Sequence, residues 1–264
     1  MCEMLQTSKL QTDKGEAAIV TGADAVSAFV VVCEHAGLAI PEGLGDLGMS
    51  AGELHSHVAW DPGAAEVAQL LAQELDGTLV KQRYSRLVYD CNRPPSSSEA
   101  MRDVSEDTQI PANRNLSQEE KRWRTQHIYS AFHDVVGDYL NRRAAPILVT
   151  VHSFTPVYHG VRRSVDVGIL HDEDARLADA VLLSAQFDEG ISVQRNEPYG
   201  PQDGVTHTLK LHSQDRQILN VMIEIKNDLI ADESSQRHYA HQLAETIKQA
   251  VGSINAADTA DEQS

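Results

Sequence analysis

The sequence contains little of what several classes of protein require. Its 264 residues include three cysteines, Cys2, Cys33 and Cys91, which do not make the disulfide framework of a small secreted protein. No apolar run approaches the roughly 18 residues that a membrane-spanning helix needs. The opening residues, MCEMLQTSKLQTDKGE, lack the apolar segment of a secretory signal. We therefore expect a soluble protein that works in the reducing cytoplasm.

Basic residues are scarce relative to acidic ones. The chain has 22 Lys and Arg residues against 39 Asp and Glu residues, which gives a formal net charge of −17 at pH 7. Because non-specific binding to nucleic acid or to an anionic membrane is driven by basic residues, we expect neither partner. Hydrophobic residues make up 41% of the chain, which is enough for one large core.

Short apolar runs alternate with amphipathic segments along the chain. The runs at 29–33, 147–151, 165–170 and 219–225 are typical of strands that are buried on both faces of a sheet. Shorter strands are predicted at 78–81 and 86–89, and helices at 63–75, 117–142, 173–186 and 235–251. Strands that alternate with helices predict an α/β fold, with three α/β/α layers around a mainly parallel central sheet.

The chain shows no internal repeat and no linker, so we predict a single α/β domain over residues 25–254. Residues 1–24 are polar with scattered charge and are predicted to form a loose N-terminal arm. Residues 255–264, NAADTADEQS, are acidic and lack large apolar side chains, which predicts a disordered tail.

Polar side chains occur where two predicted strands end. Glu34 and His35 follow the first buried strand, and His152 and Ser153 follow the strand at 147–151. In open parallel sheets, ligands bind beyond the carboxyl ends of the strands, so these positions are candidates for chemistry. A histidine at a strand end is also commonly an ordinary hydrogen-bonded residue.

Glu224 lies inside the apolar strand LNVMIEI, at a position that otherwise calls for an apolar side chain. Burying an unpaired carboxylate costs a large amount of free energy. The position therefore requires a partner for the carboxylate, a raised pKa or a bound metal.

Asp61 precedes a predicted helix in the segment HVAWDPG. Its simplest role is to cap that helix, which is worth roughly 1 kcal/mol. Two histidines and one aspartate from separate strand ends, His35, His152 and Asp61, could instead hold one divalent metal. Three protein ligands with an open position are typical of catalytic zinc sites. The chain has no local metal motif such as H-E-x-x-H to support this interpretation.

Arg86, Asn92 and Arg93 surround the short predicted strand in YSRLVYDCNRP. A guanidinium group can hold a carboxylate through two parallel hydrogen bonds, so these residues are candidates for binding an acidic substrate. A surface ion pair would explain either arginine taken singly.

Several motifs occur in an order that resembles the N-formylglutamate amidohydrolase family, namely CEHAG, HVAWDPGAA, YSRLVYDCNRP, VHSFTPV, NEPYG and IEIKNDLI. The resemblance covers about residues 28–250. That family is similar in fold and site layout to zinc carboxypeptidases, aspartoacylases and zinc-dependent muramoyl-alanine amidases. The resemblance therefore implies a fold of the zinc-exopeptidase, or phosphorylase/hydrolase-like, kind.

The resemblance also implies a site for one divalent metal, zinc, made by His35, Asp61 and His152. Relatives of the carboxypeptidase kind use H-x-x-E for the first pair of ligands, but this chain has Leu38 at the glutamate position. Asp61 is therefore the acidic ligand by analogy with the amidases, and Glu34 is its rival. Two imidazoles and a carboxylate also suit iron, cobalt or manganese.

The remaining roles follow from the same resemblance. Glu224 matches the residue that serves as general base and general acid. Asn92 and Arg93 match the clamp for a substrate carboxylate, and Arg86 is a second candidate for that role. Ser153, next to His152, is grouped with these substrate-binding residues.

The implied reaction is the hydrolysis of N-formyl-L-glutamate to L-glutamate and formate, in one route of histidine degradation. The partner is then a small acidic N-acyl amino acid. One alternative is a hydrolase of the same fold that acts on another N-acyl amino acid or a small amide. Another is a metal-free anion-binding protein that has lost catalysis.

A third alternative is a metal-independent hydrolase that uses Cys33, which shares one side of an extended segment with His35. The apolar run around Cys33 favours an inert, buried thiol instead. His133 is predicted to be a structural histidine, whereas His207 and His212 could lie in a lid or a pocket wall. The oligomeric state is left open.

Overall fold

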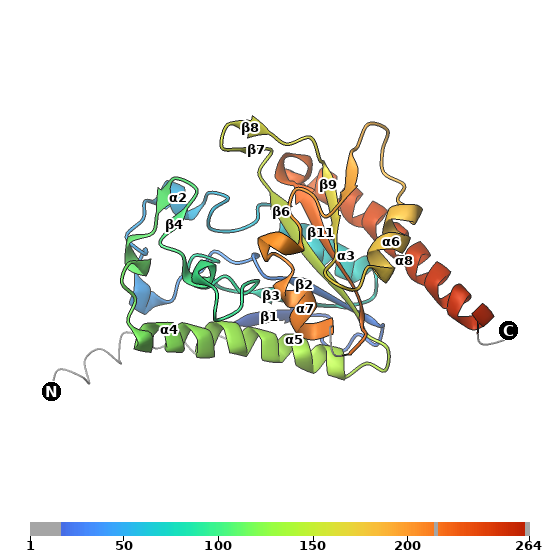
Figure 1. Cartoon of the computed structure of the whole chain (residues 1–264), viewed down its shortest axis with the longest axis horizontal. Helices are drawn as coiled ribbons and strands as arrows, with labels where there is room; N and C mark the ends of the chain where they lie inside the picture. Colours follow the sequence, from blue (N-terminus) through green and yellow to red (C-terminus); the bar gives the residue numbers. More distant parts are fainter. Residues whose placement is uncertain (1–16, 214–215, 262–264) are drawn as a thin grey trace.

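The computed structural model describes residues 17–213 and 216–261, and its centre is a seven-stranded sheet (Figure 1). Cys2, residues 1–16 of the predicted arm and residues 262–264 of the predicted tail lie outside this range. The strands of the sheet, in spatial order, are β1 (Ala18–Thr21), β3 (Thr78–Gln82), β2 (Phe29–Cys33), β6 (Ile147–Phe154), β11 (Leu219–Lys226), β9 (Val167–Leu170) and β10 (Val193–Arg195).

The sheet is mixed but mostly parallel, as the alternation of strands and helices predicts. β3, β2, β6 and β11 pair in parallel with their neighbours, and so do β9 and β10. β1 is antiparallel to β3, and β11 is antiparallel to β9. The long central strands β6 and β11 are buried almost throughout, which agrees with their unbroken apolar runs.

Helices cover both faces of the sheet, which confirms the three-layer α/β/α fold. On one face α3 (Ala64–Glu74), α6 (Arg176–Ser184) and α8 (Glu233–Asp261) pack together. On the other face lie α4 (Gln118–Arg124), α5 (Ala131–Asn141) and α7 (His207–Ser213). Successive side chains of each strand point to opposite faces and so supply two separate cores, with Val31 in one and Val30 in the other.

The predicted helix at 117–142 is continuous but not uniform (Figure 1). Ser117 caps α4 through its hydroxyl, and the Glu120 carboxylate accepts from the Ser117 backbone N–H, which completes the expected capping box. A π-helical turn, Thr125–Ser130, joins α4 to α5.

Shorter elements connect these layers. Two small hairpins are present, β4 (Val104–Ser105) with β5 (Thr108–Gln109), and β7 (Val157–Tyr158) with β8 (Val161–Arg162). The remaining elements are α2 (Ala51–Leu54) and the 3-10 turns Glu42–Leu44, Ser98–Met101, Pro111–Asn113, Pro201–Asp203 and Asn227–Ile230. No helix in the described ranges is long and apolar enough to cross a membrane.

Three expectations about local structure are corrected. The segment 86–89 is a turn rather than a strand, because the Val88 N–H bonds back to the Ser85 carbonyl at 2.9 Å. Residues 18–21 of the predicted arm form the edge strand β1, whose backbone bonds to β3. Residues 255–261 of the predicted tail continue α8 as helix. Their alanines favour helix strongly, and no glycine or proline interrupts them.

Candidate active site

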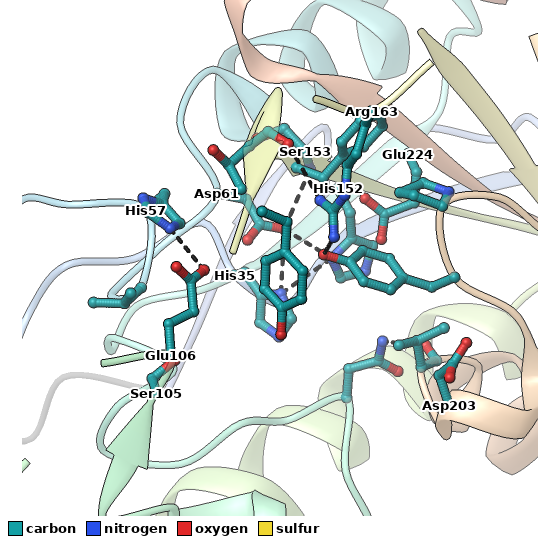
Figure 2. A pocket seen from close by; sticks show the side chains of 18 of the residues that line it. His35, His57, Asp61, Ser105, Glu106, His152, Ser153, Arg163, Asp203 and Glu224 are labelled. Atoms are coloured by element: carbon teal, nitrogen blue, oxygen red, sulfur yellow. Dashed lines mark hydrogen bonds and ion pairs between the residues drawn. The ribbon is translucent and has the colours of Figure 1, made fainter. Parts of the chain in front are cut away.

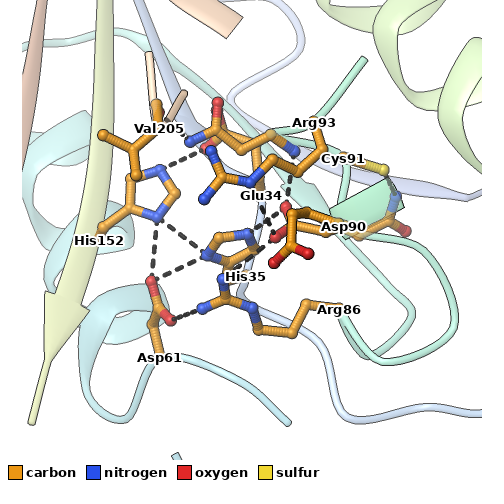
Figure 3. Close-up of polar contacts among 12 residues, drawn as sticks. Glu34, His35, Asp61, Arg86, Asp90, Cys91, Arg93, His152 and Val205 are labelled. Atoms are coloured by element: carbon orange, nitrogen blue, oxygen red, sulfur yellow. Dashed lines mark hydrogen bonds and ion pairs between the residues drawn. The ribbon is translucent and has the colours of Figure 1, made fainter. Parts of the chain in front are cut away.

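Three side chains, those of His35, Asp61 and His152, converge beyond the carboxyl ends of the parallel strands (Figure 3). Asp61 Oδ2 lies 3.2 Å from His35 Nδ1 and 3.0 Å from His152 Nδ1, and the two Nδ1 atoms are 3.1 Å apart. All three residues are buried. Within residues 17–213 and 216–261, this is the one group of three or more His, Cys, Asp or Glu residues that could hold a metal ion.

The Asp61 side chain does not cap the helix that follows it. Gly63 is the residue before α3, in a left-handed conformation (φ 79°), and it supplies no side-chain cap. A Cβ at Gly63 would stand 2.5 Å from the Ile230 carbonyl oxygen, so the turn requires glycine. The Asp61 N–H bonds to the His35 carbonyl at 3.0 Å, which leaves its carboxylate facing the imidazoles.

A carboxylate lies against the outer nitrogen of each histidine. Asp90 Oδ1 is 2.7 Å from His35 Nε2, and Glu34 Oε2 is 3.1 Å from His152 Nε2. A carboxylate at Nε2 places the ring proton there and leaves the Nδ1 lone pair for a metal. The geometry therefore favours Asp61 over Glu34 as the acidic ligand, because Glu34 contacts the far side of His152.

Asp90 lines the cavity and contacts His35, and the reasoning from sequence gave it no role. It stands between Arg86 and Arg93 in the YSRLVYDCNRP motif, so the motif already contained the signal. The backbone nearby reinforces its position, because the Asn92 N–H donates to Asp90 Oδ1 at 3.0 Å.

Burial and the neighbouring charges shift the pKa values of the site residues in opposite directions. Burial opposes ionisation of Asp61, but His35, His152 and Arg86 together hold the pKa of its carboxyl well below the usual range. Burial likewise opposes ionisation of Glu34, yet His152 lowers its pKa to about 2. Burial disfavours the charged form of His152, while Glu34 and Asp61 raise its pKa well above the ordinary value. In the protein without a metal, the ionised carboxylates of Glu34 and Asp61 are thus offset by the positive charges of His152 and Arg86.

Arg86 joins the two aspartates. Its Nη1 lies 3.1 Å from Asp61 Oδ1, and its Nη2 lies 3.1 Å from Asp90 Oδ2. Arg93 lies farther out, with Nε 4.0 Å from Asp90 Oδ2 and Nη1 donating to the Asp203 carbonyl at 3.1 Å. Both arginines line the cavity, as the prediction of a substrate clamp requires.

Asn92 and Ser153 also line the cavity, but their side chains are engaged with the protein. The Asn92 amide donates to the Val205 carbonyl and accepts from the Thr208 N–H, so it holds the start of α7. The Ser153 hydroxyl donates to the Pro62 carbonyl at 2.8 Å. Both residues position the walls of the cavity.

Glu224 lies beside His152, because β11 and β6 pair in parallel with these two residues in register. Its side chain is buried, and its Oε2 atom has no hydrogen-bond partner. Burial, followed by the negative charge of Asp61, raises the pKa of Glu224 to about 7 despite the nearby cations. A carboxyl with such a pKa can both accept and donate a proton near neutral pH.

These residues line a cavity of about 720 Å³ (Figure 2). At its far side His57 Nε2 lies 2.9 Å from Glu106 Oε1. Arg163 and Tyr199 also line the cavity, and the reasoning from sequence did not single them out. Tyr199 stands in the NEPYG motif, which was the available signal, whereas Arg163 lies beyond the end of VHSFTPV and outside the motifs.

The cysteine alternative receives no support from the structure. Cys33 is buried, and burial together with the charge of Asp61 raises the pKa of its thiol well above the ordinary value. A protonated, inaccessible thiol is a poor nucleophile. Cys33 is also absent from the lining of the cavity.

Three further histidines lie between α5 and α7 and not in the cavity wall: His133 belongs to α5, and His207 and His212 belong to α7. His133 Nδ1 is 3.0 Å from His212 Nε2, and His133 Nε2 is 2.8 Å from the Cys91 carbonyl oxygen. His207 Nε2 is 2.8 Å from the Tyr129 hydroxyl. The structural role predicted for His133 agrees with these contacts. The expected place of His207 and His212 in a pocket wall is corrected, because neither lines the cavity, and their place in a lid stays a prediction.

Comparisons with solved structures support a shared fold. The gene product Atu2144 from Agrobacterium tumefaciens is 51% identical, with a TM-score of 0.89, and the match covers 91% of this chain and 97% of that one. An N-formylglutamate amidohydrolase from Ralstonia eutropha JMP134 is 16% identical, with a TM-score of 0.61, and the match covers 90% and 100% of the two chains. No curated protein matches the sequence.

A model of one protein family matches most of the chain, from residue 27 to residue 231. The matched segment contains the His35, Asp61 and His152 group, its two outer carboxylates and Glu224. By this match, the chain belongs to the N-formylglutamate amidohydrolase family.

Proposed function

We propose that this protein is a metal-dependent hydrolase of an N-formyl, or N-acyl, acidic amino acid. The substrate that its family suggests is N-formyl-L-glutamate, and the reaction is N-formyl-L-glutamate plus water to L-glutamate plus formate. The observation that carries the proposal is the buried His35, Asp61 and His152 group with Glu224 beside it. We place the reaction in histidine degradation and in the cytoplasm.

The residues present suit a divalent metal, and zinc is our choice. Two imidazole nitrogens and one carboxylate oxygen converge, and carboxylates at both Nε2 atoms orient the rings. A metal held there by His35, Asp61 and His152 would lower the pKa of a water and polarise a carbonyl oxygen.

Glu224 is the general base and acid of the proposed reaction. It takes a proton from the attacking water as the bond from oxygen to the formyl carbon forms. It then delivers that proton to the amine nitrogen as the carbon–nitrogen bond breaks, which releases L-glutamate and formate. Its burial raises its pKa to near neutrality.

Arg93 is the proposed clamp for a substrate carboxylate. Its Nε atom has no hydrogen-bond partner, and its side chain reaches the cavity. Arg86 adds positive charge, but its nitrogens already bind Asp61 and Asp90. In the proposal Asn92 and Ser153 hold the walls around the substrate.

The size of the cavity favours a second candidate. A volume of about 720 Å³ falls within the roughly 300–1,000 Å³ of pockets for drug-sized ligands. The site therefore has room for an acyl group longer than formyl, or for an acidic residue at the end of a short peptide.

The test is formate release from N-formyl-L-glutamate, with metal analysis of the same sample before and after chelation. We expect activity that disappears on chelation and returns with zinc. N-acetyl-L-glutamate and N-succinyl-L-glutamate, assayed in parallel for free amine, measure the preference for acyl size. Bound metal without release of any acyl group would contradict the proposal, and activity in fully metal-free protein would contradict the metal dependence.

A further inference from the structure

Arg163 and Tyr199 form a hydrogen-bonded pair in the wall of the cavity. Arg163 Nη2 donates to the Tyr199 hydroxyl oxygen at 2.6 Å, and Arg163 Nη1 donates to the Thr155 carbonyl at 3.2 Å. The guanidinium carbon also lies 4.7 Å from the centres of the Tyr158 and Tyr199 rings and 5.3 Å from that of Phe154. Three aromatic faces therefore hold the guanidinium plane in place.

Arg163 differs in its partners from two other arginines that line the cavity. Arg86 is paired with Asp61 and Asp90, and Arg102 is paired with Glu99 at 3.1 Å. Within the described ranges, no acidic side chain pairs with Arg163, whose polar contacts are one carbonyl and one hydroxyl. Its positive charge is therefore not neutralised by the protein, although it lies close to a site rich in carboxylates.

Tyr199 adds a second donor. Its oxygen accepts from Arg163, so its own proton is directed elsewhere, and in residues 17–213 and 216–261 no acceptor contacts it. Burial, and then the negative charge of Glu224, raises the pKa of Tyr199 to about 12, so the hydroxyl keeps its proton at neutral pH. The guanidinium N–H groups of Arg163 and the phenolic O–H of Tyr199 lie side by side, so together they can donate hydrogen bonds to the two oxygens of a carboxylate.

The chain path brings this pair into the cavity that His152 and Glu224 also line. The hairpin of β7 and β8 follows directly from β6, the strand of His152, and the Arg163 N–H closes the hairpin on the Pro156 carbonyl at 2.9 Å. Figure 2 shows Arg163 on the same side of the cavity as Glu224, opposite His57 and Glu106.

The geometry points to Arg163 and Tyr199 as the residues that bind a carboxylate of the substrate and thereby set the preference for acidic N-acyl amino acids. This inference rests on the proposed function and adds to it a specificity-determining pair. Because stacking already fixes the guanidinium, little side-chain freedom is lost when a carboxylate binds.

The first test compares Arg163→Met with Arg162→Met, a neighbouring arginine in the same hairpin that also lines the cavity. The substrates are N-formyl-L-glutamate and its two monoamides, N-formyl-L-glutamine and N-formyl-L-isoglutamine. For Arg163→Met we expect kcat/KM on the diacid to fall at least about tenfold, mainly through KM. The amide that lacks the bound carboxylate should lose less than about twofold. Arg162→Met should lose less than about threefold on all three substrates.

Two further variants separate recognition from folding. Tyr199→Phe keeps the ring under the guanidinium and removes the hydroxyl alone, so we expect a smaller, KM-based loss on the diacid. Arg163→Lys keeps the positive charge without the planar guanidinium group, so it should bind the diacid more tightly than Arg163→Met does but less tightly than the wild type. Equal losses on all three substrates, or a loss confined to kcat, would overturn the inference.

Calorimetric binding of L-glutamate, L-glutamine and L-isoglutamine to the zinc-loaded proteins separates this inference from the proposed function. Wild-type protein that binds L-glutamate through Arg163 but releases no formate would refute the reaction and support the carboxylate site. Formate release with unchanged L-glutamate affinity in Arg163→Met would refute the site alone. Wild-type protein that neither binds nor hydrolyses these compounds would refute both.

Discussion

At the scale of single residues, the site depends on carboxylates in three different environments. Asp61 faces two imidazoles and stays ionised, and Asp90 is held in the same state by His35 and Arg86 although burial opposes it. Glu224 lacks a hydrogen bond at one oxygen, and its pKa rises to about 7 because burial outweighs the nearby cations. In the proposed function, the same chemical group, a carboxyl, thus serves as metal ligand in Asp61, as support for a ligand in Asp90 and as proton carrier in Glu224.

Glu224→Gln tests the proton carrier. The amide has the same shape but cannot take a proton from water, so we expect kcat on N-formyl-L-glutamate to fall about 100- to 10,000-fold. Bound metal, measured by elemental analysis, should stay at the wild-type level because Glu224 is not among the converging ligands. Near-normal turnover in this variant would remove Glu224 from the mechanism.

Asp90→Asn tests the support of His35. Asp90 contacts His35 Nε2 at 2.7 Å, and its loss leaves the ring free to change tautomer or orientation. We expect metal affinity to fall about 10- to 100-fold, as measured by competition with a chelator. Glu99→Gln, at the edge of the same cavity, is the matched control and should bind metal like the wild type. Unchanged affinity in Asp90→Asn would show that the contact does not orient the ligand.

At the scale of elements, α7 links the site to a buried histidine cluster. Asn92 ties the start of α7 to the motif that carries Asp90, and His212 on the same helix contacts His133 of α5. Burial lowers the pKa of His133 to about 4 and that of His212 to about 3. Both rings are therefore neutral in the folded protein at pH 7.

This cluster predicts a loss of stability in acid. In the unfolded chain both histidines take up protons below pH about 6.5. In the folded protein His133 takes up a proton only near pH 4, and His212 only near pH 3. The stability that neutral burial supplies is thus complete above pH 6.5 and declines as the pH falls toward 4. Each histidine contributes a slope of up to about 1.4 kcal/mol per pH unit.

His212→Gln should lower that slope by roughly the contribution of one proton, as measured by urea unfolding at several pH values between 6 and 4. Ser213→Ala is the matched control, because it removes a buried hydrogen bond from the same helix without removing a titrating group. It should lower the free energy of unfolding equally at every pH. An unchanged slope in His212→Gln would contradict the assignment of a neutral buried ring.

At the scale of the whole molecule, the three candidate metal ligands come from segments that are far apart in the chain. His35 follows β2, Asp61 precedes α3 and His152 lies in β6, with Asp61 and His152 separated by 91 positions. A ligand that binds these three residues together binds the folded chain and not the unfolded one. A metal bound at the proposed site would therefore stabilise the fold by mass action.

Removing the metal should lower Tm. At a free metal concentration about 1,000 times Kd, binding adds about 4 kcal/mol. For a chain of this size that corresponds to a Tm shift on the order of 10 °C, measured by calorimetry of zinc-loaded and chelated samples. Asp61→Asn should show a much smaller difference between the two samples. The same large shift in Asp61→Asn would place the metal elsewhere.

Local patterns in the sequence determined much of this protein. The apolar runs predicted β2, β6 and β11, because strands buried on both faces need continuous hydrophobic side chains. Ser117 and Glu120 marked the start of a helix, since capping depends on residues three positions apart. Family motifs indicated His35, Asp61 and His152 together, although spacing alone was a weak signal.

Long-range packing decided the rest. No local rule shows that Asp90 meets His35, that Glu34 meets the outer face of His152, or that Arg163 stacks on Tyr199. Each contact joins residues from different elements, so it exists only once those elements have packed together, just as Glu224 meets His152 only through the register of β6 and β11. Local propensity acts over a few residues, whereas charge pairing in a buried site acts between groups that folding alone brings together.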